Sequence, residues 1–124
     1  MARVLKQSDA KRLGLPGRVS LEPVSGEIGS KVSFRIAQIA VPQLGDKKRG
    51  PHVHHDFEEC IYVLSGQGVM RAENGEHPVR PGDILLVAAG EKHMAVNTGA
   101  EPLVLLCFFP VADVSAGTTE YPAF

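Results

Sequence analysis

Turn-forming residues recur at intervals of about ten along this chain, and they constrain its fold more than any other feature of the sequence. The clearest sites are Ser25-Gly26, Ser65-Gly66, Asn74-Gly75, Pro81-Gly82-Asp83, Gly90 and Thr98-Gly99. Glycine and asparagine tolerate positive φ, and proline presets a bend. Asn-Gly suits the type I′ turn of a β-hairpin in particular. Short segments separated in this way are typical of an all-β domain.

The segments between these turns have the composition of β-strands. Alternation of apolar and polar residues, or a short apolar run, predicts strands at 18–24, 31–41, 59–64, 68–72, 84–87, 93–97 and 103–109. The one helical candidate is a short turn at 8–13, with Ser8 and Asp9 as caps and with Gly14 and Pro16 ending it. The sequence therefore predicts a small antiparallel sandwich or barrel preceded by a short helical turn.

Two of the predicted strands indicate what surrounds them. In 31–41, alternation places on one largely apolar face the residues Val32, Phe34, Ile36 and Gln38. We interpret Phe34, Ile36 and Gln38 as the wall of a pocket. Strand 103–109 is apolar on both faces, so it is either covered by another segment or lies at a subunit contact. We therefore expect a homodimer.

Size and charge limit the classes of function. The 124 residues and 13.3 kDa correspond to one domain, which we divide into an arm at 1–17, a barrel at 18–109 and a tail at 110–124. We expect the tail to cover either the barrel mouth or a partner subunit. The formal net charge of −1 argues against nucleic acid or a membrane surface as the partner.

The amino terminus and the two cysteines indicate a compartment. The first nine residues are charged and lack the apolar run of a signal peptide. Cys60 and Cys107 lie within apolar runs, where a thiol usually behaves as a small hydrophobic group. We therefore expect a cytoplasmic protein with reduced thiols.

Three of the five histidines, His52, His54 and His55, fall within four positions. In an extended segment, His52 and His54 project to the same side and can converge on one point. His55 points to the opposite side, so we interpret it as a rim or hydrogen-bonding residue.

Other residues can complete a metal site around these two imidazoles. The candidates are Glu58 and Glu59 just downstream and His93 on a later strand. A regular strand would turn Glu59 away, so residues 56–57 must bend or loop to bring it back. Three imidazoles and one carboxylate suit Mn, Fe, Co, Ni, Cu or Zn.

Two segments resemble the conserved motifs of cupin proteins. Residues 52–66 (HVHHDFEECIYVLSG) resemble the first motif, in which His-x-His is followed by three or four residues, a Glu, six residues and a Gly. Residues 82–97 (GDILLVAAGEKHMAVN) resemble the second motif, in which a Gly precedes Pro-x-Gly-x-x-His and then Asn. Ala88 stands where the second motif has Pro, and Asp46 stands where the first motif begins with Gly. Neither departure falls on a ligand position.

The resemblance implies a fold and a metal site. The cupin fold is a small jelly-roll-type β-barrel that holds a metal in its interior. The family's ligand positions fall on His52, His54, Glu59 and His93, because the spacing to Gly66 selects Glu59 rather than Glu58. The implied cofactor is a divalent transition metal, one of Mn, Fe, Ni, Zn, Co and Cu.

The resemblance also implies a class of function. It indicates a metal-dependent enzyme that acts on a small oxygen-rich or enolisable metabolite, as a dioxygenase, isomerase, lyase, decarboxylase or cyclase, with the dioxygenase type favoured. Gln38 and Glu58 are the candidate catalytic residues, Gln38 to hold an oxygen near the metal and Glu58 as general base. Asn97 matches the second motif, and we expect it to satisfy backbone groups at a strand end. The alternative is a non-catalytic cupin that binds a small molecule or a sugar.

Overall fold

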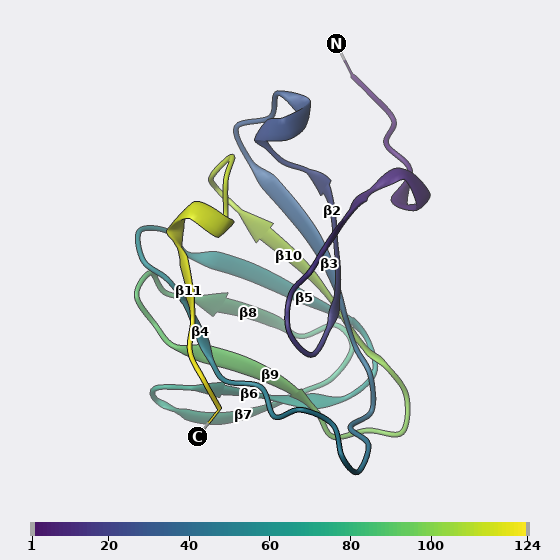
Figure 1. Cartoon of the computed structure of the whole chain (residues 1–124), viewed down its shortest axis with the longest axis vertical. Coiled ribbons are helices and arrows are strands. Elements are labelled where there is room, and N and C mark those ends of the chain that lie inside the picture. The colour runs from purple at the N-terminus through teal and green to yellow at the C-terminus, as the bar shows by residue number, and fades with distance from the viewer. Residues whose placement is uncertain (1, 124) are drawn as a thin grey trace.

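The computed structural model describes residues 2–123, which form two antiparallel β-sheets that face each other (Figure 1). The larger sheet has the strand order β1-β2-β3-β10-β5-β8 and the smaller sheet β11-β4-β9-β6-β7. The strands of the larger sheet are β1 Lys11–Leu13, β2 Val19–Val24, β3 Ser33–Ile39, β5 Glu59–Ser65, β8 Ile84–Val87 and β10 Leu103–Phe109. Those of the smaller sheet are β4 His52–His54, β6 Gly68–Ala72, β7 Gly75–Val79, β9 His93–Asn97 and β11 Thr118–Glu120. The all-β prediction is confirmed.

All seven predicted strands are present, and their ends fall within two residues of the predicted ones. Strand β7 was missed, because Pro78 and the flanking Gly75 and Pro81 favour a turn. Proline is tolerated there because β7 lies at the edge of its sheet, where one side of the strand needs no hydrogen bonds. Strand β11 lies in the predicted tail and pairs with β4, so the tail contributes a strand to the smaller sheet.

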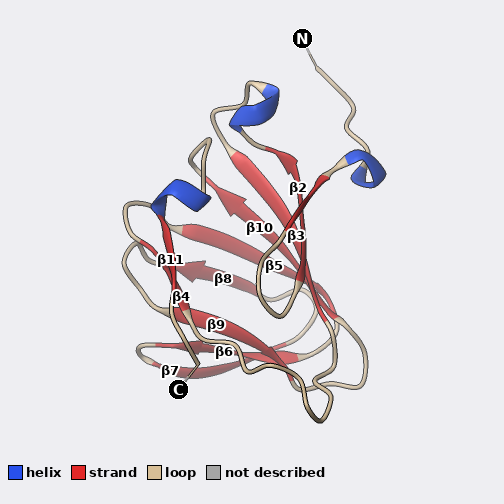
Figure 2. Ribbon diagram, viewed as in Figure 1, coloured by secondary structure: helices blue, strands red, loops and turns tan. Residues whose placement is uncertain are grey.

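The helical turn near the amino terminus is shorter than predicted. A 3₁₀ turn, η1, spans Gln7–Asp9, and two others, η2 Gly26–Ile28 and η3 Ser115–Gly117, also lie outside the sheets (Figure 2). The rest of the predicted 8–13 turn is strand β1, which pairs with β2. A single helical turn has few internal hydrogen bonds, whereas pairing at a sheet edge supplies several. The predicted helical extent is therefore wrong beyond Asp9.

The hairpin predicted at Asn74-Gly75 is present between β6 and β7, but its turn is not type I′. Ala72 is paired with Gly75, so the two loop residues are Glu73 and Asn74. Neither has positive φ, which a type I′ turn requires at both positions. Gly75, with φ 129°, instead absorbs the unusual backbone conformation at the start of β7.

The core lies between the sheets, and β10 supplies one full face of it. Leu103, Leu105, Cys107 and Phe109 are all buried, and Val63 of β5 is completely inaccessible. The opposite side chains of β10 point away from the core, and Phe108 is 47% exposed. The two apolar faces of this strand therefore have different surroundings, one covered by the smaller sheet and one open.

Strand β3 presents the opposite face to the interior from the one predicted. Arg35, Ala37 and Ile39 line the internal cavity, whereas the predicted wall residues Phe34, Ile36 and Gln38 alternate with them on the other face of the strand. The predicted alternation of side chains along β3 was correct, but the more apolar of its two faces was wrongly taken to face the cavity. Arg35 can face inward because the buried carboxylate of Glu22 on β2 neutralises its charge.

The outer face of the larger sheet is markedly apolar. The side chains of Cys60, Tyr62, Leu64, Ile84, Leu86 and Phe108 are exposed there. Cys60 is thus on the surface rather than packed in the core, and Cys107 is on the inner face of the adjacent strand. Both thiols are free. Among residues 2–123, no helix is long and apolar enough to cross a membrane.

Candidate metal centre

Strands of both sheets bring the four predicted ligands together. His52 and His54 lie on β4, and His52 is paired with His93 at the start of β9. Glu59 begins β5 of the larger sheet and reaches across to them. Residues 55–58 leave the strand between His54 and Glu59, as the sequence requires. The donor atoms of the four side chains lie within 4.8 Å of one another.

The glutamate is at the centre of the cluster. Its Oε1 lies 3.1 Å from Nε2 of His54 and 3.0 Å from Nε2 of His93. Glu59, His54 and His93 are each no more than 4% exposed. His52 is half-buried and its ring centre lies 4.2 Å from that of His93. The cluster is therefore open to the cavity mainly on the side of His52.

Hydrogen bonds behind the cluster fix which ring nitrogen of His54 and His93 carries the hydrogen. Nδ1 of His93 lies 2.9 Å from the carbonyl oxygen of Glu91, which can only accept. Nδ1 of His54 lies 2.8 Å from the hydroxyl of Thr118, and that hydroxyl donates its one hydrogen to the carbonyl of Val114. Both Nδ1 atoms are therefore donors, and both Nε2 atoms of the neutral rings present a lone pair to Glu59.

Such an arrangement needs a cation between each lone pair and the carboxylate, and without a metal ion that cation is a proton on Nε2. Burial alone would raise the pKa of Glu59, but hydrogen bonds from His54 and His93 outweigh it and hold that pKa well below its usual range. Burial alone would lower the pKa of His93, but the hydrogen bond and charge of Glu59 raise it. Burial and the positive charge of His93 lower the pKa of His52 to about 2, so His52 stays neutral.

The donor set fits a divalent transition metal. Metal ligands must be deprotonated, and a divalent ion would take the place of the protons that Nε2 of His54 and Nε2 of His93 otherwise share with Glu59. Histidines that bind metals usually donate their other ring N–H to an outer acceptor, as His54 and His93 do to Thr118 and Glu91. Three nitrogens and one oxygen would leave coordination positions open on a five- or six-coordinate ion.

A cavity of about 140 Å³ adjoins the cluster. Its wall contains apolar residues of both sheets and also three arginines, Arg18, Arg35 and Arg49. Ser115, Thr118 and Glu120 line it as well, so the carboxy-terminal segment covers part of this cavity.

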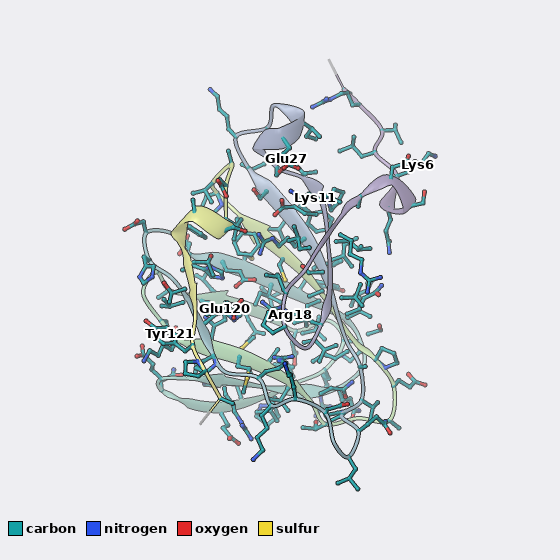
Figure 3. The ribbon with its side chains drawn as sticks, in the orientation of Figure 1. Lys6, Lys11, Arg18, Glu27, Glu120 and Tyr121 are labelled. Carbon is teal, nitrogen blue, oxygen red and sulfur yellow. The ribbon has the colours of Figure 1, made fainter. Side chains whose placement is uncertain are left out.

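Two of the three arginines are paired with carboxylates. Nε of Arg35 lies 2.7 Å from Glu22, and both side chains are less than 10% exposed. Arg18 lies 2.9 Å from Oε1 of Glu120, and Figure 3 shows the two side chains next to each other near β11. None of the three arginines was predicted from the sequence to line the site. A charged residue inside an otherwise apolar strand, as at Arg35, was the available signal, whereas Arg49 lies in a loop without any such pattern.

The two candidate catalytic residues do not lie with the ligands. Neither Gln38 nor Glu58 is among the residues that line the cavity. Gln38 is on the outer side of β3, and Glu58 is exposed in the loop before β5. The prediction that Gln38 holds an oxygen near the metal is wrong, because Ala37 and Ile39 take the inner positions of that strand.

Two other polar residues have the structural roles expected of them. His55 is exposed and its Nε2 lies 2.7 Å from the hydroxyl of Thr119. Asn97 is buried, and its amide donates to the carbonyls of Ile39 and Glu101 at 2.9 and 2.8 Å. Its side-chain oxygen accepts from the backbone N–H of Gly99. Asn97 therefore satisfies backbone groups at the end of β9, as predicted.

Comparisons with known proteins agree with this architecture. An uncharacterized protein of Methanocaldococcus jannaschii is 32% identical over 91 residues, which cover 73% of this chain and 71% of that protein. An oxalate-binding protein of Thermotoga maritima is 35% identical over 57 residues, which cover 46% of this chain and 47% of that protein.

Solved structures show the same fold at low sequence identity. A predicted oxalate decarboxylase of Thermotoga maritima superposes with a TM-score of 0.72 at 23% identity, covering 88% of this chain and 99% of that one. A polyketide cyclase of Streptomyces resistomycificus gives 0.76 at 18% identity, covering 100% and 87%. The family model described as a cupin domain matches residues 40–109, more than half of the sequence. The chain belongs to the cupin family.

Proposed function

We propose that this cupin is a metal-dependent enzyme that acts on a small oxygen-rich or enolisable metabolite. One observation carries the proposal: the Nε2 lone pairs of His54 and His93 converge on one oxygen of Glu59 while their Nδ1 hydrogens are already bonded elsewhere. A bound divalent ion would resolve this arrangement and would polarise an oxygen of the substrate as a Lewis acid.

The protein's own residues set the charge and the access of that site. Three neutral imidazoles and the Glu59 carboxylate would leave about one positive charge on a divalent ion, which favours an anionic or enolisable oxygen ligand. Met70, Ala95 and Leu105 line the same cavity and exclude water from part of it. A drier site strengthens the attraction between the ion and a negatively charged oxygen.

The size of the cavity supports a small substrate. Pockets that hold drug-sized molecules measure roughly 300–1,000 Å³. The cavity here, about 140 Å³, is well below that range. The cavity beside the cluster therefore favours a metabolite of a few carbon atoms as the substrate.

The test is turnover by the metal-loaded protein. Small hydroxy, keto and dicarboxylic acids and diketones would be incubated with it, with product formation and oxygen uptake followed together. We expect turnover of one of the small acids, lost in His93→Ala and retained in the matched surface variant His77→Ala. Oxygen uptake in step with product would assign the dioxygenase type, and product without uptake a lyase, isomerase or cyclase. Turnover that survives His93→Ala would contradict the proposal.

The second candidate is a non-catalytic binding protein. The name of the Thermotoga maritima relative, an oxalate-binding protein, favours it. A binding cupin would be stabilised thermally by its ligand in proportion to occupancy but would leave that ligand unchanged. Ligand-induced stabilisation without turnover of the same compound would therefore replace the enzyme by this function.

We further propose that the protein is a cytoplasmic homodimer that pairs through the outer face of its larger sheet. Register places side chains of β10, β5 and β8 in two adjoining rows, Phe108–Cys60–Leu86 and Leu106–Tyr62–Ile84. Ile84 and Leu86 are 69% and 68% exposed. The largest apolar patch of a monomer is about 300–600 Å², and a stable interface buries about 800 Å² per partner. These two exposed apolar rows are the surface that we expect a second copy to cover. The two free cysteines support a reducing compartment.

A further inference from the structure

Charge is unevenly compensated in the wall of the cavity. Arg35 and Arg18 each face a carboxylate, Glu22 and Glu120. Arg49 forms no ion pair within residues 2–123, and its one hydrogen bond there is from a terminal nitrogen to the carbonyl oxygen of Ala95, at 2.6 Å. A guanidinium has five N–H donors, so most of those of Arg49 have no protein acceptor.

Two contacts position the side chain of Arg49. Its side chain crosses directly over Gly17, where a Cβ would overlap with the Cγ and Cδ of Arg49. Gly17 also has φ +70°, a conformation that glycine adopts without strain. The stem thus contacts Gly17 and the head bonds to Ala95, and Arg49 lines both the cavity beside the cluster and a neighbouring cavity of about 860 Å³ that shares Ile39 and Ala95 with it. The remaining donors therefore lie where the two cavities adjoin. A donor held in this way loses little conformational entropy when a ligand binds.

The electrostatic environment of Arg49 favours an anion beside it. Burial and the positive charge of Arg18 both lower the pKa of Arg49, which shows that its charge is poorly stabilised by the protein alone. Glu120 offsets this only in part and is itself paired with Arg18. A planar guanidinium with free adjacent donors matches the two oxygens of a carboxylate or a phosphate.

We propose that Arg49 is a specificity-determining residue of the cavity, where it binds the carboxylate or phosphate of a small anionic substrate whose other oxygen group ligates the metal. The inference rests on the proposed function and names its substrate class, an organic anion with two separated oxygen groups. It requires positive charge at two places in one cavity, the metal at His52, His54, Glu59 and His93, and the guanidinium of Arg49.

Calorimetric binding to the metal-loaded protein tests the proposal. The probes are malonate for a carboxylate, phosphonoacetate for a phosphate-like group, and malonamide as their neutral analogue. Removal of a charge-assisted hydrogen bond lowers binding affinity about 10- to 100-fold. We expect Arg49→Gln to weaken the better of the two anions by that factor, Arg49→Lys to weaken it less, and Arg80→Gln, an exposed arginine outside the cavity, to leave it unchanged. The anion that binds more tightly shows whether the substrate group is a carboxylate or a phosphate.

A second pair of variants moves Arg49 without removing its charge. Gly17→Ala would displace the arginine stem and should reproduce the loss seen in Arg49→Gln. Gly29→Ala is its matched control, because Gly29 also has positive φ but a Cβ there would meet no atom within 4 Å. Unfolding temperatures of all variants would show that each is folded at the temperature of the binding experiment.

The outcomes separate this inference from the proposed function. Metal-loaded Arg49→Gln that binds both anions within about twofold of wild type would overturn the anion site and leave the metal enzyme standing. Malonamide binding as tightly as malonate, or no anion binding at millimolar concentration, would also overturn it. Anion binding that depends on Arg49 in a protein unable to hold metal would support the anion site and contradict the proposed function.

Discussion

Thr118 lies outside the four-residue cluster but positions one of its members, His54. Its hydroxyl donates to the carbonyl of Val114 and accepts from Nδ1 of His54. The same contact fixes the orientation of the imidazole ring and keeps its Nε2 lone pair directed at Glu59. Residues of this kind are as much part of a metal site as the ligands themselves.

Replacing Thr118 by valine should weaken metal binding while keeping every ligand. Valine has the same shape but cannot accept from Nδ1 of His54, so the ring loses its fixed tautomer. We expect metal affinity to fall about 10- to 100-fold, measured by competition with a chromophoric chelator. Thr119→Val is the matched control, because Thr119 contacts the exposed His55 instead. A change of less than about twofold in Thr118→Val would show that the hydroxyl does not position the ligand.

The residues of the candidate metal centre could be predicted from the sequence, but the cavity wall could not. The resemblance to the cupin motifs, through the spacing to Gly66, selected Glu59, whereas strand alternation did not distinguish it from Glu58. Gln38 was placed wrongly because apolar neighbours were taken to indicate the inner face. Arg49 was missed because its role depends on Gly17, which is distant in the sequence and close only in the fold.

At the scale of elements, Asn97 joins three segments at one end of the sandwich. Its amide and side-chain oxygen bond to the end of β3 at Ile39 and to the turn after β9, at Gly99 and Glu101. Alanine would leave two carbonyls and one N–H without this partner, the carbonyl of Ile39 in a buried place and the other two groups in partly buried ones. Each unsatisfied buried group costs about 1–3 kcal/mol, with some recovered by water.

We therefore expect Asn97→Ala to lower the free energy of unfolding by about 2–4 kcal/mol, measured by urea denaturation of the metal-free protein. Asn74→Ala is the control, because Asn74 makes one exposed side-chain contact, with His77. That variant should change the free energy by no more than about 0.5 kcal/mol. Equal effects of the two substitutions would be inconsistent with Asn97 joining the segments.

The sequence predicted the long strands more reliably than the short ones. Strands such as β5 and β10 have both a strong apolar pattern and clear turns at each end, so their local signals agree with the fold. Strands β1 and β11 have three residues each, too few for alternation to appear. They exist because β2 and β4 supply hydrogen bonds along an open edge. That contribution comes from distant parts of the chain, which local patterns do not reveal.

At the scale of the whole molecule, the exposed apolar rows on β10, β5 and β8 determine the expected assembly. A lysine at Leu86 would place a charge in the middle of the proposed dimer contact, where its desolvation opposes association. We expect wild type to be a dimer at micromolar concentration and Leu86→Lys to be a monomer, by sedimentation velocity. Leu44→Lys should remain dimeric, since Leu44 is fully exposed in a loop outside these strands. A monomeric wild type would contradict this interface.

The metal content of the purified protein is the most direct test of the central claim, that His52, His54, Glu59 and His93 hold one metal ion. The protein would be purified without a chelating resin and analysed by mass spectrometry of its elements. The account predicts about one divalent transition-metal ion per subunit in wild type and almost none in folded His52→Ala. Metal in fewer than about a tenth of wild-type subunits, with no further loss in His52→Ala, would contradict it.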